Sequence, residues 1–531
     1  MKMLGRQFFD AAVRNVIEFG DTDIFPFPIE NLVLRDKQKE IVKLLCSSRS
    51  FFDKCFIQHP PSHISCLAPV GTTGFRWATQ LDPFWNAFLL GTTLAIAKDA
   101  EQARIPVEKN VIFSYRLGTK YLDGQIFRED ITWQNFIQHS IKLSEDAKYV
   151  VICDIADCYQ RISHHRLENA LVQLADNSPS SKQIMEVLKN FSNTKSYGLP
   201  VGGPAARLLV ELVLNLTDQV LKSHKVRFCR YADDYHLFVD REDDAYDILQ
   251  FISEKFFRND GLTLQKSKTR ILSSAEYRAS HAPSTAIEGE GKDAQKLFSL
   301  KLRYDPYSLN APEKYEELRN ELKSIDILGL LNLEMSKTRV HSALAKKLIS
   351  AVRHLDQPVQ TNAILALLES LDALYPLFPV LAVTIKSAMP SLLPEIREKV
   401  CASIRERIIK NAYLLNNELH AAYAARILAE VKSADNQEAL VTLYSKFKGP
   451  LVRRDVILIM GKWKEFPFLS DQINEYAGAS AWEKRALIVA SYAMKDAGKH
   501  WREYMVPKFS PFDLLVRDWA AAQPASWTIP I

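Results

Sequence analysis

The sequence lacks any hydrophobic run long enough to cross a membrane, since none reaches the roughly 18 uninterrupted apolar residues that such a span needs. Its opening, MKMLGRQFFDAAVRN, has no apolar stretch of signal-peptide length. The 7 cysteines are odd in number and scattered, which is typical of reduced, mostly buried thiols rather than of a disulfide framework. These absences predict a cytoplasmic protein without a membrane partner.

The sequence also lacks a strong excess of charge of either sign. Lys and Arg number 68 against 63 Asp and Glu, a net charge of +5. This balance neither indicates nor excludes a nucleic-acid partner, because a phosphate-binding groove needs local clustering of cations rather than a large total. At 531 residues the chain is too long for one ordinary core, so two or three domains are expected.

The first half of the chain changes its periodicity near residue 148. Residues 1–110 have mostly helical spacing of apolar residues, most clearly over 81–104. Between about 148 and 272, short β-rich runs such as YVVIC (149–153) and YHLFV (235–239) alternate with amphipathic helices. This pattern predicts an α+β domain.

The second half favours helices. From about 274 to 312 the sequence is irregular and predicts a connector, and nearly everything after it up to about 500 is compatible with helix. Three similar segments, AAYAARILAEV, LVRRDVILIMG and WEKRALIVASY, place arginines at positions 426, 454 and 485. An interval of about 30 residues favours stacked helical hairpins, with an irregular helical bundle as the alternative.

Three aspartates form the main candidate site. Asp154 directly follows the strand-like run YVVIC, and Asp233 and Asp234 lie between two apolar runs, at the tip of a predicted hairpin. Adjacent carboxylates at a tight turn repel each other unless cations occupy the site. Mg²⁺ prefers oxygen ligands, and two such ions can catalyse phosphoryl transfer. The pattern therefore predicts a site for two Mg²⁺ ions, with Mn²⁺ as an alternative.

The motifs around these aspartates resemble those of a known family. DIADCYQRI, GLPVGGPAARLLVEL, YADD and GLTLQKSKTRI follow one another in the order of four palm motifs of reverse transcriptases. VIFSYRLG (111–118) resembles a finger motif of bacterial abortive-infection and other defence-associated reverse transcriptases of the AbiK type. The resemblance implies fingers and palm over 1–278, a connector over 279–312, and an all-α helical-repeat (HEAT-like) domain over 313–531.

The resemblance also implies roles for residues of the site. Asp154, Asp233 and Asp234 would bind the two metal ions, and the carbonyl of Ile155 would complete one coordination shell. Lys268 would protonate the departing pyrophosphate, although a solvated lysine in a basic run is the alternative.

Further residues would contact the nucleotide. Tyr159 would crowd a ribose 2′-hydroxyl and so favour deoxynucleotides, unless it is a core residue. Gly202 and Gly203 would let the backbone approach the nucleotide closely. Tyr231 would lie at the same site, as the aromatic residue of the YADD hairpin.

Three arginines complete the predicted nucleotide site. Arg76 and Arg116 are candidates for gripping the triphosphate, because the arginine fork matches phosphate oxygens; surface ion pairs are the alternative. Arg207 would face the substrate or shape the turn before its helix.

Members of the resembled group extend DNA from a protein hydroxyl, without a conventional template. The implied function is a self-primed DNA polymerase of antiphage defence that uses dNTPs. Its product would be single-stranded DNA, which in one alternative is covalently attached to the protein. The resemblance also implies a homo-oligomer. Val201 stands where the family usually has Gln, which weakens the case for ordinary templated copying. Tyr121, Tyr304 and Tyr307 are priming candidates. Alternatives are an enzyme that copies a bound noncoding RNA, and a palm-derived scaffold whose helical array binds a partner.

Overall fold

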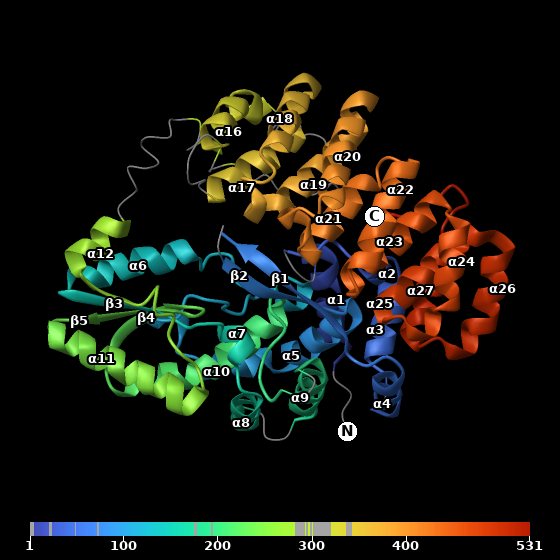
Figure 1. The fold of residues 1–531 in the computed structure, drawn as a ribbon. Coiled ribbons are helices and arrows are strands. Elements are labelled where there is room, and N and C mark those ends of the chain that lie inside the picture. Colours follow the sequence, from blue (N-terminus) through green and yellow to red (C-terminus); the bar gives the residue numbers. More distant parts are fainter. Residues whose placement is uncertain are drawn as a thin grey trace.

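The structure, a computed structural model, describes residues 5–20, 24–47, 49–71, 74–174, 178–192, 195–281, 293, 296–297, 300, 320–335 and 342–531. An antiparallel sheet with helices on both faces lies at one end of the molecule, and the C-terminal helices follow one another in an arc around the other end (Figure 1). The N-terminal helices lie between these two parts.

The sheet has four antiparallel strands in the order β4-β5-β3-β6. Their bounds are Tyr149–Asp154 (β3), Arg227–Tyr231 (β4), Asp234–Val239 (β5) and Arg270–Ser273 (β6). Successive side chains point to opposite faces, and residues on both faces are buried, which explains the nearly continuous apolar runs. The strands predicted at 149–153 and 235–239 are thus confirmed.

Helices cover both faces of the sheet. One face packs against α6 and α12 around a small core that includes Phe136, Val150 and Tyr277. The other face, with Val151 and Tyr235, belongs to the main core and packs against α11, and the Tyr235 hydroxyl donates to Asp218 of α10. The bounds are Trp133–Glu145 (α6), Pro204–Ser223 (α10), Glu242–Lys255 (α11) and Ser274–His281 (α12).

The N-terminal part contains a β-hairpin that the helical interpretation of residues 1–110 missed. Strands β1 (His63–Val70) and β2 (Gly74–Leu81) pair antiparallel, with Leu67 opposite Trp77. The helices of this part are α1 (Arg6–Phe19), α2 (Glu30–Asp36), α3 (Gln38–Leu45), α4 (Arg49–Gln58) and α5 (Pro83–Ala103). The long helix α5, predicted over 81–104, is buried along most of its length.

Short helices α7 (Cys158–Arg161), α8 (His164–Leu174) and α9 (Pro179–Ser192) connect β3 to α10. The predicted irregular connector is wrong at its beginning, because residues 274–281 form α12, whose Tyr277 is fully buried. Residues 282–292 and 301–319 lie outside the described residues, and so do the priming candidates Tyr304 and Tyr307. Among the described residues, no helix has both the length and the apolar composition that crossing a membrane requires.

The described part of the C-terminal region contains helices joined by turns, and no strand. Helices α17, α19, α21, α23, α25 and α27 pack side by side in chain order, and helices between them in sequence pack on this row. The bounds are Ile327–Met335 (α16), Ser342–Ala351 (α17), Gln357–Glu369 (α18), Phe378–Ala388 (α19), Pro394–Ile409 (α20), Glu418–Leu428 (α21), Ala434–Lys446 (α22), Pro450–Trp463 (α23), Phe466–Asn474 (α24), Ala481–Ala490 (α25), Lys495–Met505 (α26) and Pro511–Ala521 (α27). We call this region the helical array.

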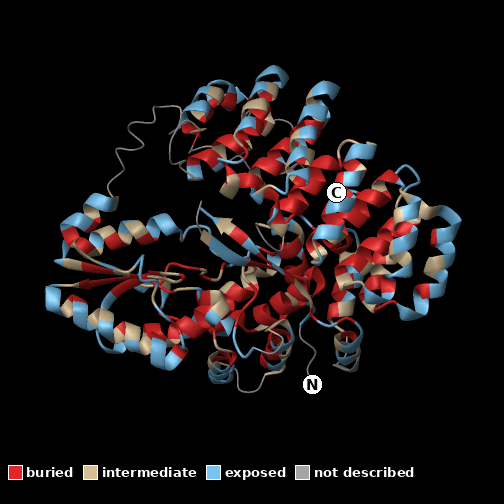
Figure 2. Ribbon diagram, in the orientation of Figure 1, coloured by how far each residue is buried: buried red, intermediate tan, exposed pale blue. Residues whose placement is uncertain are grey.

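The recurring arginines of the array contact the N-terminal part. Arg485 (α25) is completely buried, and it forms ion pairs with Glu30 at 2.7 Å and Asp82 at 2.8 Å. Arg426 and Arg454 donate to backbone carbonyls of residues 27 and 26, respectively. We call Arg485, Glu30 and Asp82 the junction cluster. The burial map shows many buried residues where the array meets the N-terminal helices (Figure 2).

Candidate active site

Strand register brings the three candidate aspartates to one end of the sheet. Asp154, the last residue of β3, lies directly opposite Asp234, the first residue of β5. Asp233 precedes it in the turn, and its carbonyl accepts a hydrogen bond from the amide of Ile155 at 3.2 Å. Ala232 has a positive φ of 52°, a left-handed conformation that is unfavourable for a residue with a Cβ. The hairpin predicted from YADD is therefore present, with its carboxylates beside Asp154.

The three aspartates of this site place more negative charge together than nearby cations balance. Burial, followed by the charges of Asp233 and Asp154, raises the pKa of Asp234 to about 7. Burial also raises the pKa of Asp233, and the nearby Asp154 adds to this effect. Asp234 is therefore partly protonated near neutral pH, so a cation that binds to it would displace a proton.

Lys268 supplies a positive charge at the site. Its ammonium Nζ lies 2.9 Å from Oδ1 of Asp154, and its side chain is 63% exposed. This hydrogen bond, which outweighs partial burial, raises the pKa of Lys268. Within the described part of the chain, no three His, Cys, Asp or Glu side chains form a ready metal cage. The donor set nevertheless fits a hard cation, because it consists of carboxylate oxygens with excess negative charge.

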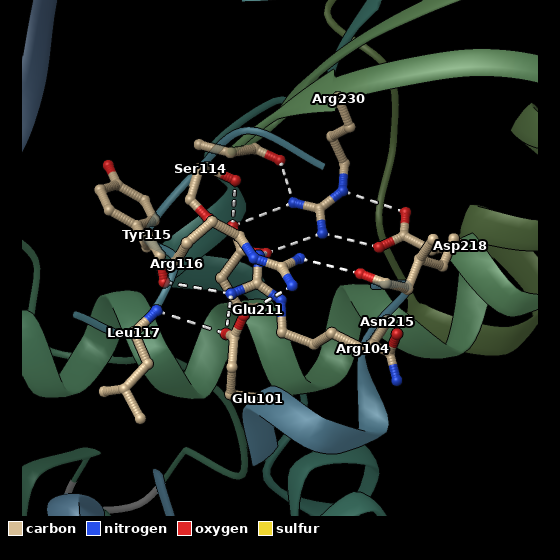
Figure 3. Close-up of polar contacts among 12 residues, drawn as sticks. Glu101, Arg104, Ser114, Tyr115, Arg116, Leu117, Glu211, Asn215, Asp218 and Arg230 are labelled. Carbon is tan, nitrogen blue, oxygen red and sulfur yellow. Dashed lines mark hydrogen bonds and ion pairs between the residues drawn. The ribbon is translucent and has the colours of Figure 1, made fainter. Parts of the chain in front are cut away.

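A buried network of ion pairs lies behind the catalytic turn (Figure 3). Arg230 of β4 bonds both Glu211, at 2.8 Å, and Asp218, at 2.6 Å, two acidic residues on one side of α10. Glu211 also accepts from Arg104 at 2.6 Å and from Ser114 at 2.5 Å. Burial alone would raise the pKa of Glu211, but the charges of Arg104 and Arg230 outweigh this effect and lower the pKa. We call Glu101, Arg104, Arg116, Glu211, Asp218 and Arg230 the palm ionic cluster.

The cluster holds the catalytic turn directly. Nη1 of Arg230 donates to the carbonyl of Ala232 at 2.8 Å. This bond joins the carboxylates of α10 to the residue that precedes Asp233. Because Ala232 has the strained left-handed conformation, the surrounding structure must maintain it, and Arg230 makes one of the contacts that do so.

The position of Arg116 speaks against its predicted role. Its side chain is buried in the palm ionic cluster, where Nη2 lies 2.6 Å from Oε1 of Glu101 and Nη1 donates to a backbone carbonyl at 3.1 Å. To grip a triphosphate, Arg116 would have to leave these buried partners, so its predicted role is not proposed further. Arg76 is exposed on β2, which leaves its predicted role as a proposal.

Tyrosines and one arginine line the other side of the turn. Tyr159 of α7 is close enough to Tyr115 to affect the pKa of its phenol, and burial raises the pKa of both phenols. The guanidinium of Arg207 lies 5.3 Å from the centroid of the Tyr115 ring, in cation–π geometry. Arg207 is only partly buried, unlike Arg116. Tyr231 packs edge-on against Trp133, at 5.3 Å between ring centroids.

The glycine-rich turn before α10 has two positions, Gly198 and Gly202, whose positive φ favours glycine. Gly202 has a φ of 114°, which L side chains rarely adopt. Gly203 has an ordinary φ of −79° as the N-cap of α10, and an added Cβ would lie 3.3 Å from Oδ1 of Asn86. The predicted close approach of a nucleotide to this turn stays a prediction.

Comparison with known proteins decides the domain type. Residues 96–330 match the family described as "Reverse transcriptase (RNA-dependent DNA polymerase)". This segment is a reverse transcriptase domain. By family, its chemistry is that of a nucleotidyltransferase, an RNA-directed DNA polymerase, acting on nucleotides and nucleic acid. A search of curated proteins gave no match.

Among solved structures, the chain is similar to apo telomerase from Candida tropicalis, with 10% identity, 68% of each chain covered and a TM-score of 0.32. It is also similar to telomerase from Candida albicans in complex with the TWJ fragment of telomeric RNA, with 10% identity, 75% of this chain and 68% of that chain covered, and a TM-score of 0.29. Scores this low carry no functional information.

Sequence reasoning missed the residues that support the site. Glu211, Asp218 and Arg230 are buried charges whose partners lie between 12 and 107 positions away in the sequence. A weak signal was present, since Glu211 and Asp218 interrupt the apolar side of an amphipathic helix. Tyr115 lies within VIFSYRLG, which the sequence marked as a motif without distinguishing its tyrosine.

Proposed function

We propose that the chain is a DNA polymerase of antiphage defence that adds deoxynucleotides at Asp154, Asp233 and Asp234 and begins synthesis on a protein hydroxyl. The observation that carries the catalytic part is the strand register that sets Asp154 opposite Asp234, with excess negative charge between them. Carboxylate oxygens with excess negative charge are the ligands that a site for hard cations requires.

Two Mg²⁺ ions held by these carboxylates and the carbonyl of Ile155, or Mn²⁺ in their place, would activate the attacking hydroxyl and stabilise the departing pyrophosphate. Lys268 is accessible to solvent and hydrogen-bonded to Asp154. In this proposal, its ammonium gives a proton to the leaving group.

Other side chains of this chain would select and hold the nucleotide. Tyr159 follows Asp154 by one short turn and, in this proposal, excludes a ribose 2′-hydroxyl by steric contact. Arg207, half-buried beside the tyrosines, replaces Arg116 as the arginine proposed to meet the phosphates, together with the exposed Arg76. Tyr231, Gly202 and Gly203 would complete the nucleotide site.

Self-priming and defence rest on sequence resemblance and on one departure from the family pattern. Val201 stands at the turn where the family usually has Gln, in a segment that leads directly into α10. We propose the helical array as a HEAT-like domain that mediates self-association or lines a nucleic-acid channel. Its buried junction with the N-terminal part would keep this surface in a fixed position relative to the palm.

Templated copying of a bound RNA is the second candidate, and a pocket favours it. A cavity of about 580 Å³ lies between the β1–β2 hairpin and the turn before α10. Its lining combines the aromatic rings of Trp77 and Tyr197 with the cations of Arg161 and Lys195. Rings that can stack on bases, next to cations that attract phosphates, suit a single-stranded nucleic acid.

Incubation of the full chain with Mg²⁺ and each labelled dNTP or rNTP, without primer or template, tests the proposal. Label that migrates with the protein, prefers dNTPs, shifts after proteinase K and disappears in the Asp233→Asn/Asp234→Asn variant is the expected result. Incorporation only after a primer–template or copurified RNA is added would replace self-priming with templated synthesis. No incorporation under either condition would favour the scaffold alternative.

A further inference from the structure

The β1–β2 hairpin is held at both of its edges. It is a two-stranded sheet among the described residues, so each strand has one edge that no neighbouring strand covers. On the β2 edge, the carbonyl of Trp77 accepts a hydrogen bond from Nε2 of Gln160 in α7 at 3.2 Å. On the β1 edge, the carbonyl of Leu67 accepts one from Nδ2 of Asn417 at 2.5 Å. Leu67 and Trp77 lie directly opposite each other, so α7 and the helical array hold the hairpin at the same level (Figure 1).

The orientation of the Asn417 side chain is fixed by the helix that it begins. Asn417 is the N-cap of α21, and its Oδ1 accepts hydrogen bonds from the amides of Leu419 at 3.0 Å and His420 at 3.3 Å. Because the oxygen is engaged in the cap, the amide nitrogen is left to donate to the carbonyl of Leu67. Helix α21 also packs against β1. One side chain of the array thus both caps a helix and binds the hairpin.

One face of the hairpin is a wall of the cavity of about 580 Å³. Side chains alternate along a strand, and opposite residues share a face, so the four lining residues of the hairpin lie on the same face: His63, Ser65, Trp77 and Thr79. Trp77 is 53% exposed, and Tyr197, which also lines the cavity, is 45% exposed. Large rings that stay exposed in a cavity are available for stacking on bases.

We propose that Asn417 is a positioning residue for single-stranded nucleic acid, because it fixes the hairpin so that Trp77 can stack on a base in the cavity. This inference rests on the second candidate function, in which a single strand binds this cavity. Stacking requires a ring in a defined position, and a two-stranded hairpin alone is at most marginally stable. Hydrogen bonds on both edges supply the missing rigidity. In this way the array contributes to binding without touching the nucleic acid.

The experiment measures the Kd of a fluorescein-labelled single-stranded oligouridylate for the full chain by anisotropy, without nucleotides, so that no extension takes place. Asn417→Asp keeps an oxygen that caps α21 and replaces the donor by an acceptor that repels the carbonyl of Leu67. We expect the Kd to rise about fivefold, the value of one ordinary hydrogen bond, and the melting temperature to change little. Hydrogen exchange of the β1 and β2 amides should become faster by about the same factor, because the hairpin opens more often.

Asn416→Asp is the matched control. It introduces the same charge one residue earlier, where the side chain is bonded within the array, to Lys446 at 2.5 Å and to the carbonyl of Asn411 at 3.3 Å. This variant should leave the Kd and the hydrogen exchange of the hairpin unchanged. An equal rise of the Kd in Asn416→Asp and Asn417→Asp would show that charge weakens binding, and it would overturn the inference.

Trp77→Ala separates this inference from the function on which it rests. It removes the stacking ring and should raise the Kd about tenfold, the value of one base stacked on an aromatic side chain. An unchanged Kd in Trp77→Ala, or no binding by the wild-type protein, would overturn both the single strand in the cavity and the inference. A higher Kd in Trp77→Ala, but not in Asn417→Asp, would keep the cavity as the binding site and reject the role of Asn417.

Discussion

Two buried groups of charges in this chain have opposite electrostatic characters. In the junction cluster, Asp82 is completely buried, yet Arg485 and His59 hold its pKa below the usual range. At the catalytic turn, burial and neighbouring carboxylates raise the pKa of Asp234 to about 7. The carboxylate of Asp82 is thus paired with enough cations in the junction cluster, whereas that of Asp234 has too few cations near it at the catalytic turn. Matched charge joins parts of a fold, whereas unmatched charge is suited to binding a metal ion.

Removal of the unmatched carboxylates should give the largest effect on activity. We expect Asp233→Asn/Asp234→Asn to lower dNMP incorporation by about a thousandfold or more, because it removes metal ligands that lower the barrier by several kcal/mol. The melting temperature of the metal-free variant at pH 8 should not fall, since the lost charges disfavour the folded state. A large loss of stability would show that these aspartates are matched by cations after all.

Disruption of the junction cluster should lower the stability of the protein and leave its activity nearly unchanged. Arg485→Ala leaves Glu30 and Asp82 buried without their cation, which should destabilise the protein by about 3–5 kcal/mol in chemical denaturation. The activity of the molecules that stay folded should change little. Arg241→Ala is the control, because its partner Asp243 is exposed and such pairs contribute little. Equal stability of the two variants would contradict the importance of the junction.

The pKa of Asp234 predicts how metal binding depends on pH. Because its pKa is raised to about 7, the proton contributes stability to the metal-free fold at low pH, and this contribution is lost as pH rises through 7. Metal binding must displace that proton, so the Mg²⁺ concentration for half-maximal activity should be about tenfold higher at pH 6 than at pH 8. Incorporation measured across Mg²⁺ concentrations tests this, and no pH dependence would indicate an ordinary carboxyl pKa.

The smallest effect is expected from a variant that relieves the backbone strain at Ala232 in the catalytic turn. Ala232→Gly should relieve the positive φ and change stability by no more than about 1 kcal/mol, because gained flexibility of the unfolded chain offsets the relief. Activity should fall only slightly, since Arg230 still binds the carbonyl of residue 232. A thousandfold loss of activity would show that the methyl group itself is needed at the site.

Local patterns predicted the elements that carry the chemistry. The apolar runs before Asp154 and after Asp234 have the length and composition of buried strands, and α10 has clear helical spacing. The β1–β2 hairpin was missed although each strand has 8 residues, because the strands lie between helices in a part of the chain whose spacing is mostly helical. Arg116 and Arg207 are chemically equal in sequence, and only the packing shows that one is buried and the other reaches the tyrosines.

Contacts between residues that are far apart in the sequence could not be predicted from it. The interval between Arg426, Arg454 and Arg485 predicted repeated helices, but nothing in it indicated that these side chains reach the N-terminal part. The contacts of Glu211 with Arg104 and Ser114 likewise join segments about a hundred residues apart, which no local pattern reveals.

Localised cleavage by Fe²⁺ tests the central claim most directly, because Fe²⁺ bound in place of Mg²⁺ generates radicals that cut the nearby backbone in the presence of ascorbate and peroxide. We predict cuts near Asp154 and near Asp233 and Asp234, which Mg²⁺ suppresses and which are absent in Asp233→Asn/Asp234→Asn. Cuts that persist in that variant, or that occur only elsewhere in the chain, would contradict a metal site at the unmatched carboxylates.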